Sequence, residues 1–234
     1  MNDSLNLVVV YGSESTALRN TIDWLLENKC CLIRIFKSKT PKPHPLCIDI
    51  QGIDELQNAI ERANHLVDGP LRIGLIGCAF VRQNSLMLQM SDKEITDAID
   101  TNILSYLRIT QILLTTMIKN KFGRIVFLSS FRAEHPNPGA VLYGASKSFV
   151  ESFYTGIGRE YGRFNISTVS IRMGYFDSGM LTEYSEEQIK KSRKSIASGR
   201  FGNGEDLLSA IKFSLLTEYT NSGIIELNGG LIRE

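Results

Sequence analysis

Residues 5–11 read Leu-Asn-Leu-Val-Val-Val-Tyr, a short apolar run that can fill both faces of a strand. Six similar runs follow along the chain: 30–36 (CCLIRIF), 46–50 (LCIDI), 71–79 (LRIGLIGCA), 124–130 (RIVFLSS), 166–172 (ISTVSIR) and 223–227 (GIIEL). Several are nearly continuous in Val, Ile and Leu, as is typical of parallel strands that helices cover on both faces. The first run therefore predicts the opening strand of a parallel sheet.

Longer stretches with helical spacing separate these runs, at 15–28, 53–67, 92–120, 142–161 and 204–217. Strands that alternate with helices predict an α/β fold, a doubly wound Rossmann-type sheet of seven parallel strands with right-handed crossovers. No repeat or Pro/Gly-rich linker interrupts the alternation, so we expect one domain over residues 1–234. Ligands of such sheets bind at the carboxyl ends of the strands, where the chemistry should be sought.

Composition excludes several classes of protein. The 26 Lys and Arg residues balance 25 Asp and Glu residues, which gives no polybasic surface for nucleic acid. No apolar run approaches the roughly 20 residues of a membrane span, and residues 1–5 carry no basic signal-peptide region. The four cysteines and three histidines have no metal-ligand or disulfide-framework spacing. We expect a cytoplasmic protein with no nucleic-acid, membrane or metal partner.

One cluster of residues predicts proton-transfer chemistry. The segment Tyr143-Gly-Ala-Ser-Lys147 places a phenol and an ammonium four residues apart, on one helix face. A neighbouring ammonium favours the phenolate and lowers a pKa that is normally about 10, which suits an alcohol–carbonyl interconversion. Ser130, at the end of an apolar run, could hydrogen-bond the reacting oxygen. Taken alone, Tyr-x-x-x-Lys is also common as a solvated pair, but the position beside a strand end favours an active site.

At this point the sequence resembles the short-chain dehydrogenase/reductase family, and within it the 3-oxoacyl-[acyl-carrier-protein] reductases. The resemblance covers almost the whole chain, and its further segments are 82–87 (RQNSLM), 91–94 (SDKE), 99–102 (IDTN), 197–202 (ASGRFG) and 222–230 (SGIIELNGG). It implies a catalytic tetrad of Asn102, Ser130, Tyr143 and Lys147. Tyr143 would be the general acid, Lys147 would lower its pKa and hold the nicotinamide ribose, and Ser130 would orient the carbonyl. Asn102 would hold a water, or alternatively satisfy local backbone inside a helix.

The sequence first departs from the family pattern in the glycine-rich turn, which reads Gly-x-x-x-Gly-x-Gly in the family. Here the turn reads Gly12-Ser-Glu-Ser-Thr16-Ala-Leu18, so only Gly12 remains. The family's glycines let the backbone approach the pyrophosphate, and we expect Thr16 and Leu18 to add bulk there and Glu14 to add negative charge. Ser13 and Ser15 could still donate hydrogen bonds to an anion. The sequence leaves open whether cofactor binding is altered or lost.

Two further departures fall on loops that face the cofactor in the family. The family's Asn-Asn-Ala-Gly becomes Ile76-Gly-Cys-Ala79, and its Pro-Gly becomes Met173-Gly174. By resemblance, Ala79 and Gly174 remain cofactor contacts. Phe176 would offer backbone groups to the carboxamide, and Ser178 stands for the usual threonine near the nicotinamide.

Two features favour a dinucleotide, and NADPH in particular. The run 30–36 is followed by Lys37 with no acidic residue there, and a lysine suits the 2′-phosphate of NADP, although it could also be a solvated surface lysine. By resemblance, Asp49 contacts the adenine, with Ile50 beside it.

The resemblance implies NADPH-dependent reduction of a carbonyl, foremost a 3-oxoacyl thioester on an acyl carrier protein or a related β-keto compound. It also implies a homotetramer and a substrate lid over residues 181–200. The alternative is a catalytically weak or inactive subunit that assembles with an active homologue. The lost glycines favour that alternative, whereas the retained tetrad argues against it. An extended sugar-nucleotide epimerase shares Tyr-x-x-x-Lys but usually has a longer carboxyl-terminal domain.

Overall fold

Within the residues that the structure describes, the sheet has seven strands, all parallel, in the order β3-β2-β1-β4-β5-β6-β7. The structure is a computed structural model that describes residues 5–37, 41–82, 85–177 and 185–231. The strands are β1 (Leu7–Tyr11), β2 (Cys31–Ile35), β3 (Cys47–Ile50), β4 (Ile73–Gly77), β5 (Gly123–Ser130), β6 (Ile166–Met173) and β7 (Gly223–Leu227). The predicted doubly wound α/β fold is confirmed.

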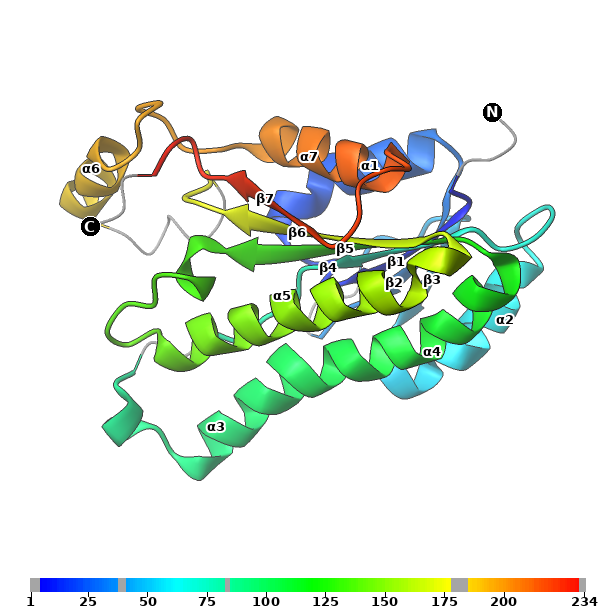
Figure 1. The fold of residues 1–234 in the computed structure, drawn as a ribbon, viewed down its shortest axis with the longest axis horizontal. Helices are drawn as coiled ribbons and strands as arrows, with labels where there is room; N and C mark the ends of the chain where they lie inside the picture. The colour runs from blue at the N-terminus through cyan, green and yellow to red at the C-terminus, as the bar shows by residue number, and fades with distance from the viewer. Residues whose placement is uncertain (1–4, 38–40, 83–84, 178–184, 232–234) are drawn as a thin grey trace.

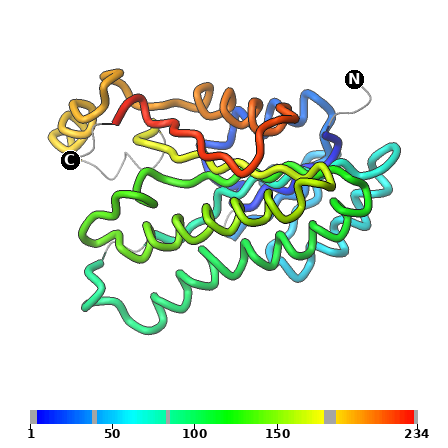
Figure 2. Tube along the Cα trace, in the orientation of Figure 1, coloured from blue at the N-terminus to red at the C-terminus, as the bar shows by residue number. Residues whose placement is uncertain are grey.

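Helices cover both faces of the sheet (Figure 1). They are α1 (Arg19–Glu27), α2 (Leu56–Asn64), α3 (Asp92–Ile99), α4 (Ser105–Asn120), α5 (Val141–Tyr161), α6 (Glu186–Lys194) and α7 (Gly204–Leu216). Helices α1 and α7 lie side by side on one face, although they are far apart in the sequence, and α2, α4 and α5 cover the other (Figure 2). Within the described ranges, no helix is long and apolar enough to cross a membrane.

The apolar run of β1 is explained by burial on both sides. Leu7 and Val9 belong to the core beneath α4 and α5, whereas Val8 and Val10 belong to the core beneath α1 and α7. All four side chains are completely buried. A strand of this kind has no solvent-facing side, which is why its sequence shows no polar alternation.

The predicted helix 92–120 is divided in the structure. Helix α3 begins at a capping box in which Ser91 accepts a hydrogen bond from the backbone of Glu94, and α4 ends at Asn120. Between them lies a π-helical turn, η4 (Asp100–Leu104). Such turns are common at functional sites because the extra residue redirects a side chain. Here the turn contains the fully buried Asn102.

Helix α6 stands at the carboxyl edge of the sheet, near the loop that follows β5 (Figures 1 and 2). Ser185 caps its first turn, which is acidic, and its last turn is basic, in the order that complements a helix dipole. The helix lies within the predicted lid 181–200, of which residues 181–184 fall outside the described residues. The lid function stays a prediction.

Candidate active site

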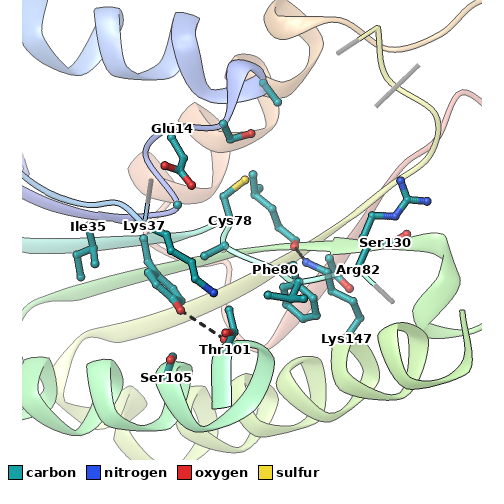
Figure 3. A pocket seen from close by; sticks show the side chains of 18 of the residues that line it. Glu14, Ile35, Lys37, Cys78, Phe80, Arg82, Thr101, Ser105, Ser130 and Lys147 are labelled. Atoms are coloured by element: carbon teal, nitrogen blue, oxygen red, sulfur yellow. Dashed lines mark hydrogen bonds between the residues drawn. The ribbon is translucent and has the colours of Figure 1, made fainter. Parts of the chain in front are cut away.

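A cavity of about 740 Å³ runs along the carboxyl ends of the central strands, within the size range of small-molecule sites (Figure 3). Its lining comes from the turn after β1, the ends of β2, β4, β5 and β6, the π-turn and the start of α5. The predicted site residues that line it are Gly12, Ser15, Lys37, Ala79, Ser130, Tyr143, Lys147, Gly174 and Phe176.

The structure brings Ser130, Tyr143 and Lys147 together at one end of this cavity. Ser130 is the last residue of β5, and its hydroxyl is near enough to the phenol of Tyr143, in the first turn of α5, to lower the pKa of that phenol. Lys147 follows one helical turn later, and its Nζ donates to the Leu128 carbonyl at 2.5 Å. The Ser130 Oγ also accepts from the Arg132 amide at 3.2 Å, which fixes the hydroxyl at the start of the next loop. A reacting oxygen placed here would meet the hydroxyls of Ser130 and Tyr143, the first of them oriented by the Arg132 amide.

Burial controls the protonation of this group. Burial raises the pKa of the Tyr143 phenol, while the nearby Ser130 hydroxyl and the charges of Arg82 and Arg132 lower it. Burial also lowers the pKa of the Lys147 ammonium to about 7. Burial of the Tyr143 phenol outweighs the effects that lower its pKa. The predicted action of Lys147 on the Tyr143 pKa stays a prediction. The ammonium lies 5.8 Å from the Tyr143 ring centre and faces other rings instead.

Those rings belong to residues that the sequence did not single out. The Phe80 ring centre lies 3.4 Å from the Lys147 Nζ, and the Phe127 ring centre lies 4.7 Å from it. Phe80 also packs edge-on against the Tyr143 ring, at 5.4 Å between centroids. In the sequence, the only sign of these contacts is that the aromatic Phe80 directly follows the small residues 77–79. The ring contacts favour the charged ammonium and therefore oppose the effect of its burial.

The Asn102 side chain hydrogen-bonds the backbone of the loop after β4. Its Oδ1 accepts from the Val81 amide at 2.8 Å, and its Nδ2 donates to the Val81 carbonyl at 2.9 Å. Asn102 is not part of the cavity lining. The Asn102 amide therefore binds the backbone of a loop 21 residues away rather than the local helix backbone of the stated alternative, and its action on a water stays a prediction.

The loop after β4 is held without the family's asparagines. The Tyr11 carbonyl accepts from the amides of Cys78 and Ala79 at 2.8 and 3.0 Å. The Tyr106 hydroxyl donates to the Ala79 carbonyl at 2.7 Å. A Cβ at Gly77 would lie 2.5 Å from the Tyr106 ring, so the glycine makes room for this ring. In this chain the side chains of Tyr106 and Asn102 therefore anchor the loop.

The altered glycine-rich turn keeps its main bend. Gly12 has φ +86°, and a Cβ there would lie 2.5 Å from the Ala79 nitrogen, so this glycine is required. The expectation that Leu18 adds bulk at the phosphate position is wrong, because its side chain is completely buried in the core shared with α1 and α7. Thr16 lines the cavity. Ser13 is buried with its Oγ 3.5 Å from the Ile35 carbonyl, and it is not in the lining.

The end of the cavity where we expected the adenine is lined by other residues than predicted. Lys37 extends into the cavity from the end of β2 (Figure 3). Asp49 instead forms a two-point ion pair with Arg34, with N–O distances of 2.7 and 2.9 Å, and neither Asp49 nor Ile50 lines the cavity. Gln51 and Ile53 take that place. The parallel register sets Arg34 beside Asp49, which explains why this carboxylate is turned to its neighbour.

The third altered loop contributes to the same wall. Met173, Gly174 and Phe176 line the cavity, and the Gly174 amide donates to the Leu227 carbonyl at 3.0 Å. Ser178 lies outside the described residues.

The cavity's donor set fits an anionic dinucleotide. Its described lining holds three basic side chains, Lys37, Arg82 and Lys147, against a single carboxylate, Glu14. Ser129 also lines the cavity, and its buried Oγ has no hydrogen-bond partner in the described part of the protein. A ligand hydroxyl or amide would satisfy this atom. Across the same residues, no three His, Cys, Asp or Glu side chains gather into a metal site.

The family model for short chain dehydrogenases matches residues 27–189. The chain belongs to the short-chain dehydrogenase/reductase family of oxidoreductases. It is 29% identical over 192 residues to the 3-oxoacyl-[acyl-carrier-protein] reductase FabG of Aquifex aeolicus, covering 81% of this chain and 77% of that one. It is 27% identical over 188 residues to the same-named protein of Pseudomonas aeruginosa, covering 80% and 75%.

Solved structures share the fold across nearly the whole chain. ElxO with NADP bound has a TM-score of 0.83 at 17% identity and covers 97% of this chain and 98% of its own. A 4-hydroxyisoleucine dehydrogenase complexed with NADH has a TM-score of 0.85 at 19% identity and covers 96% and 98%. These likenesses establish the architecture.

Proposed function

We propose that this protein is an NADPH-dependent carbonyl reductase. The observation that carries the proposal is that Ser130, Tyr143 and Lys147 line one end of a cavity that is rich in cationic side chains. An inactive partner subunit is not favoured, because a scaffold has no physical need for these three residues in one place.

When bound, the dinucleotide would supply the hydride. Gly12, Ser15, Thr16 and Lys37 would hold its phosphates, and Gly174 and Phe176 would border its nicotinamide. The chain's own residues then handle the proton. Ser130 orients the carbonyl oxygen by hydrogen bonding, and Tyr143 gives its hydroxyl proton to the developing alkoxide. A raised phenol pKa keeps Tyr143 protonated at neutral pH, as a proton donor must be.

We propose a 3-oxoacyl thioester on an acyl carrier protein as the substrate, in fatty acid or polyketide biosynthesis. The named relatives support this class. A second cavity of about 610 Å³ lies beyond Ser130, between the loop after β5, helix α6 and the segment after β7. Phe131 and Tyr175 line it as a packed aromatic pair, and Lys191 and Lys194 contribute charge at its α6 side. This space would accept the carbonyl-bearing chain.

We also propose that the protein prefers NADP and assembles as a homotetramer. Lys37 in the cavity supports the 2′-phosphate contact. Phe213 and Leu216 on α7 and Ile224 on β7 expose 50%, 57% and 42% of their surface. Apolar side chains of this size on neighbouring elements support self-association, rather than isolated monomers.

The test is the substitution Tyr143→Phe, which removes the proton donor and keeps the ring. We expect NADPH-dependent reduction of a 3-oxoacyl thioester to fall by a factor of about 10²–10⁴, the usual contribution of general acid catalysis. The NADPH dissociation constant should change by no more than about tenfold, because one neutral hydrogen bond contributes only ~0.5–1.5 kcal/mol. Steady-state assays and a fluorescence titration measure the two quantities. Turnover that survives the substitution contradicts the mechanism.

A further inference from the structure

The Phe80 ring covers the ammonium that the proposed reaction needs. Lys147 is 3% exposed, and its Nζ lies 3.4 Å from the Phe80 ring centre. An ammonium has three N–H donors, and one of them goes to the Leu128 carbonyl. Leu128 and Phe127 belong to the sheet, whereas Phe80 approaches from the loop after β4 and lines the cavity (Figure 3). Leu128 and Lys147 line the cavity as well, and Phe80 covers the side of the ammonium that its ring faces.

The backbone around Phe80 is fixed on both sides. The Ala79 carbonyl is held by the Tyr106 hydroxyl, and both backbone groups of Val81 are held by Asn102. The ring itself is half-buried and packs against Tyr106 and Tyr143 with centroid distances of 5.9 and 5.4 Å. Removing the ring from Lys147 thus requires a side-chain rotation, because the loop cannot easily shift.

We propose that Phe80 is a gate over Lys147, whose ring must swing aside before a ribose hydroxyl of the dinucleotide can bind the ammonium. This inference rests on the proposed cofactor function. The ring face and a hydroxyl oxygen compete for the same side of the ammonium, so the closed arrangement lowers the fraction of molecules that can bind. Apparent affinity falls by that fraction. The gate sets the cofactor affinity of this chain through a residue that performs no chemistry.

The first experiment compares NADPH dissociation constants of the parent protein, Phe80→Ala and Phe80→Leu by fluorescence titration. Phe153→Ala is the matched control, because Phe153 is also a partly buried ring but packs against Tyr154, away from the cavity lining. We expect Phe80→Ala to bind about 30-fold more tightly, the equivalent of a desolvated cation–π contact of ~2 kcal/mol. Phe80→Leu keeps most of the side-chain bulk, so its affinity for NADPH should lie between those of the parent protein and Phe80→Ala. Unchanged or weaker binding in both Phe80 variants overturns the gate.

The second experiment needs no nucleotide and separates this inference from the proposed function. A neutral soluble nitroxide relaxes exposed nuclei, so the relaxation of the Lys147 ε-carbon in [ε-¹³C]lysine-labelled protein reports its exposure. Lys93, whose side chain is 82% exposed, is the internal reference. We expect several-fold stronger relaxation of Lys147 in Phe80→Ala than in the parent. Equal relaxation of Lys147 in the two proteins overturns the gate. If relaxation increases but no variant binds NADPH, the result supports Phe80 as the cover of Lys147 and refutes the proposed cofactor function.

Discussion

Replacing Arg172 with methionine should destabilise the protein strongly, because it leaves a buried carboxylate without its partner. Arg172 lies in β6 with its side chain 16% exposed, and Glu151 on α5 is 5% exposed. The Arg172 Nε and Nη2 donate to the two Glu151 oxygens at 3.0 and 2.9 Å. The Arg172 Nη1 also donates to Glu134 and Glu226, at 2.8 and 3.1 Å, but these carboxylates are 41% and 36% exposed.

The magnitude follows from the burial of each pair. Breaking a buried ion pair by removing one partner costs about 3–5 kcal/mol, whereas each exposed pair contributes about 0–1 kcal/mol. For a chain of this size, that loss corresponds to a fall in melting temperature of roughly 6–20 °C. The buried Glu151 accounts for most of it. Glu151 follows Lys147 by one helical turn, so the pair also ties α5 to β6, the strand beside β5.

The assay is urea unfolding followed by circular dichroism at fixed protein concentration, with two comparison variants. Arg200→Met is the matched control, because Arg200 makes an equally close two-point pair with Asp206, at 2.6 and 2.9 Å, but is 59% exposed. It should cost about 1 kcal/mol or less. Adding Glu151→Gln to Arg172→Met removes the stranded charge and should recover most of the lost stability. The reasoning is refuted if Arg172→Met costs no more than Arg200→Met, or if the double variant recovers nothing.

Two further predictions concern Lys147 and Lys37. Folding lowers the Lys147 pKa from 10.5 to about 7, so the unfolded chain holds more protons between these pH values and the free energy of unfolding should rise with pH there. Lys147→Met should remove this slope and raise stability at pH 6.5 by up to about 5 kcal/mol, and identical slopes in urea unfolding of the two proteins would disprove the assignment. Lys37→Ala should weaken NADPH binding about 10- to 100-fold, the value of one charged hydrogen bond, and leave NADH binding nearly unchanged. Parallel titrations measure the two dissociation constants. An equal loss of affinity for NADPH and NADH would show that Lys37 does not bind the 2′-phosphate.

Sheet architecture was readable from the sequence because burial on both faces leaves a direct mark on each strand. The run 71–79 shows where that mark ends. It contains β4 (Ile73–Gly77), but Cys78 and Ala79 turn out of the sheet to hydrogen-bond the Tyr11 carbonyl. The break of 92–120 at η4 was not predicted, and the Asn102 side chain in this turn bonds the Val81 backbone 21 residues earlier. Hydrophobic periodicity does not contain such long-range contacts.

Residue types at the site were readable, but their partners were not. Tyr143 and Lys147 share a helix face by spacing alone, and a strand end places Ser130 beside them. By contrast, the Arg34 pair of Asp49 and the burial of Leu18 depend on neighbouring strands and helices. The Phe80 cover on Lys147 is of the same kind, since a loop and a helix distant in sequence meet there. Motif comparison detects the lost glycines and cannot show where the replacing side chains go.

The most direct test of the central claim is a fluorescence titration of the purified parent protein with NADPH, and with NADH in parallel. The cavity from Gly12 to Lys147, with its three basic residues and one carboxylate, predicts saturable micromolar binding with NADPH the tighter ligand. No binding of either nucleotide at millimolar concentration would contradict the account and would direct attention to a role as partner of an active homologue.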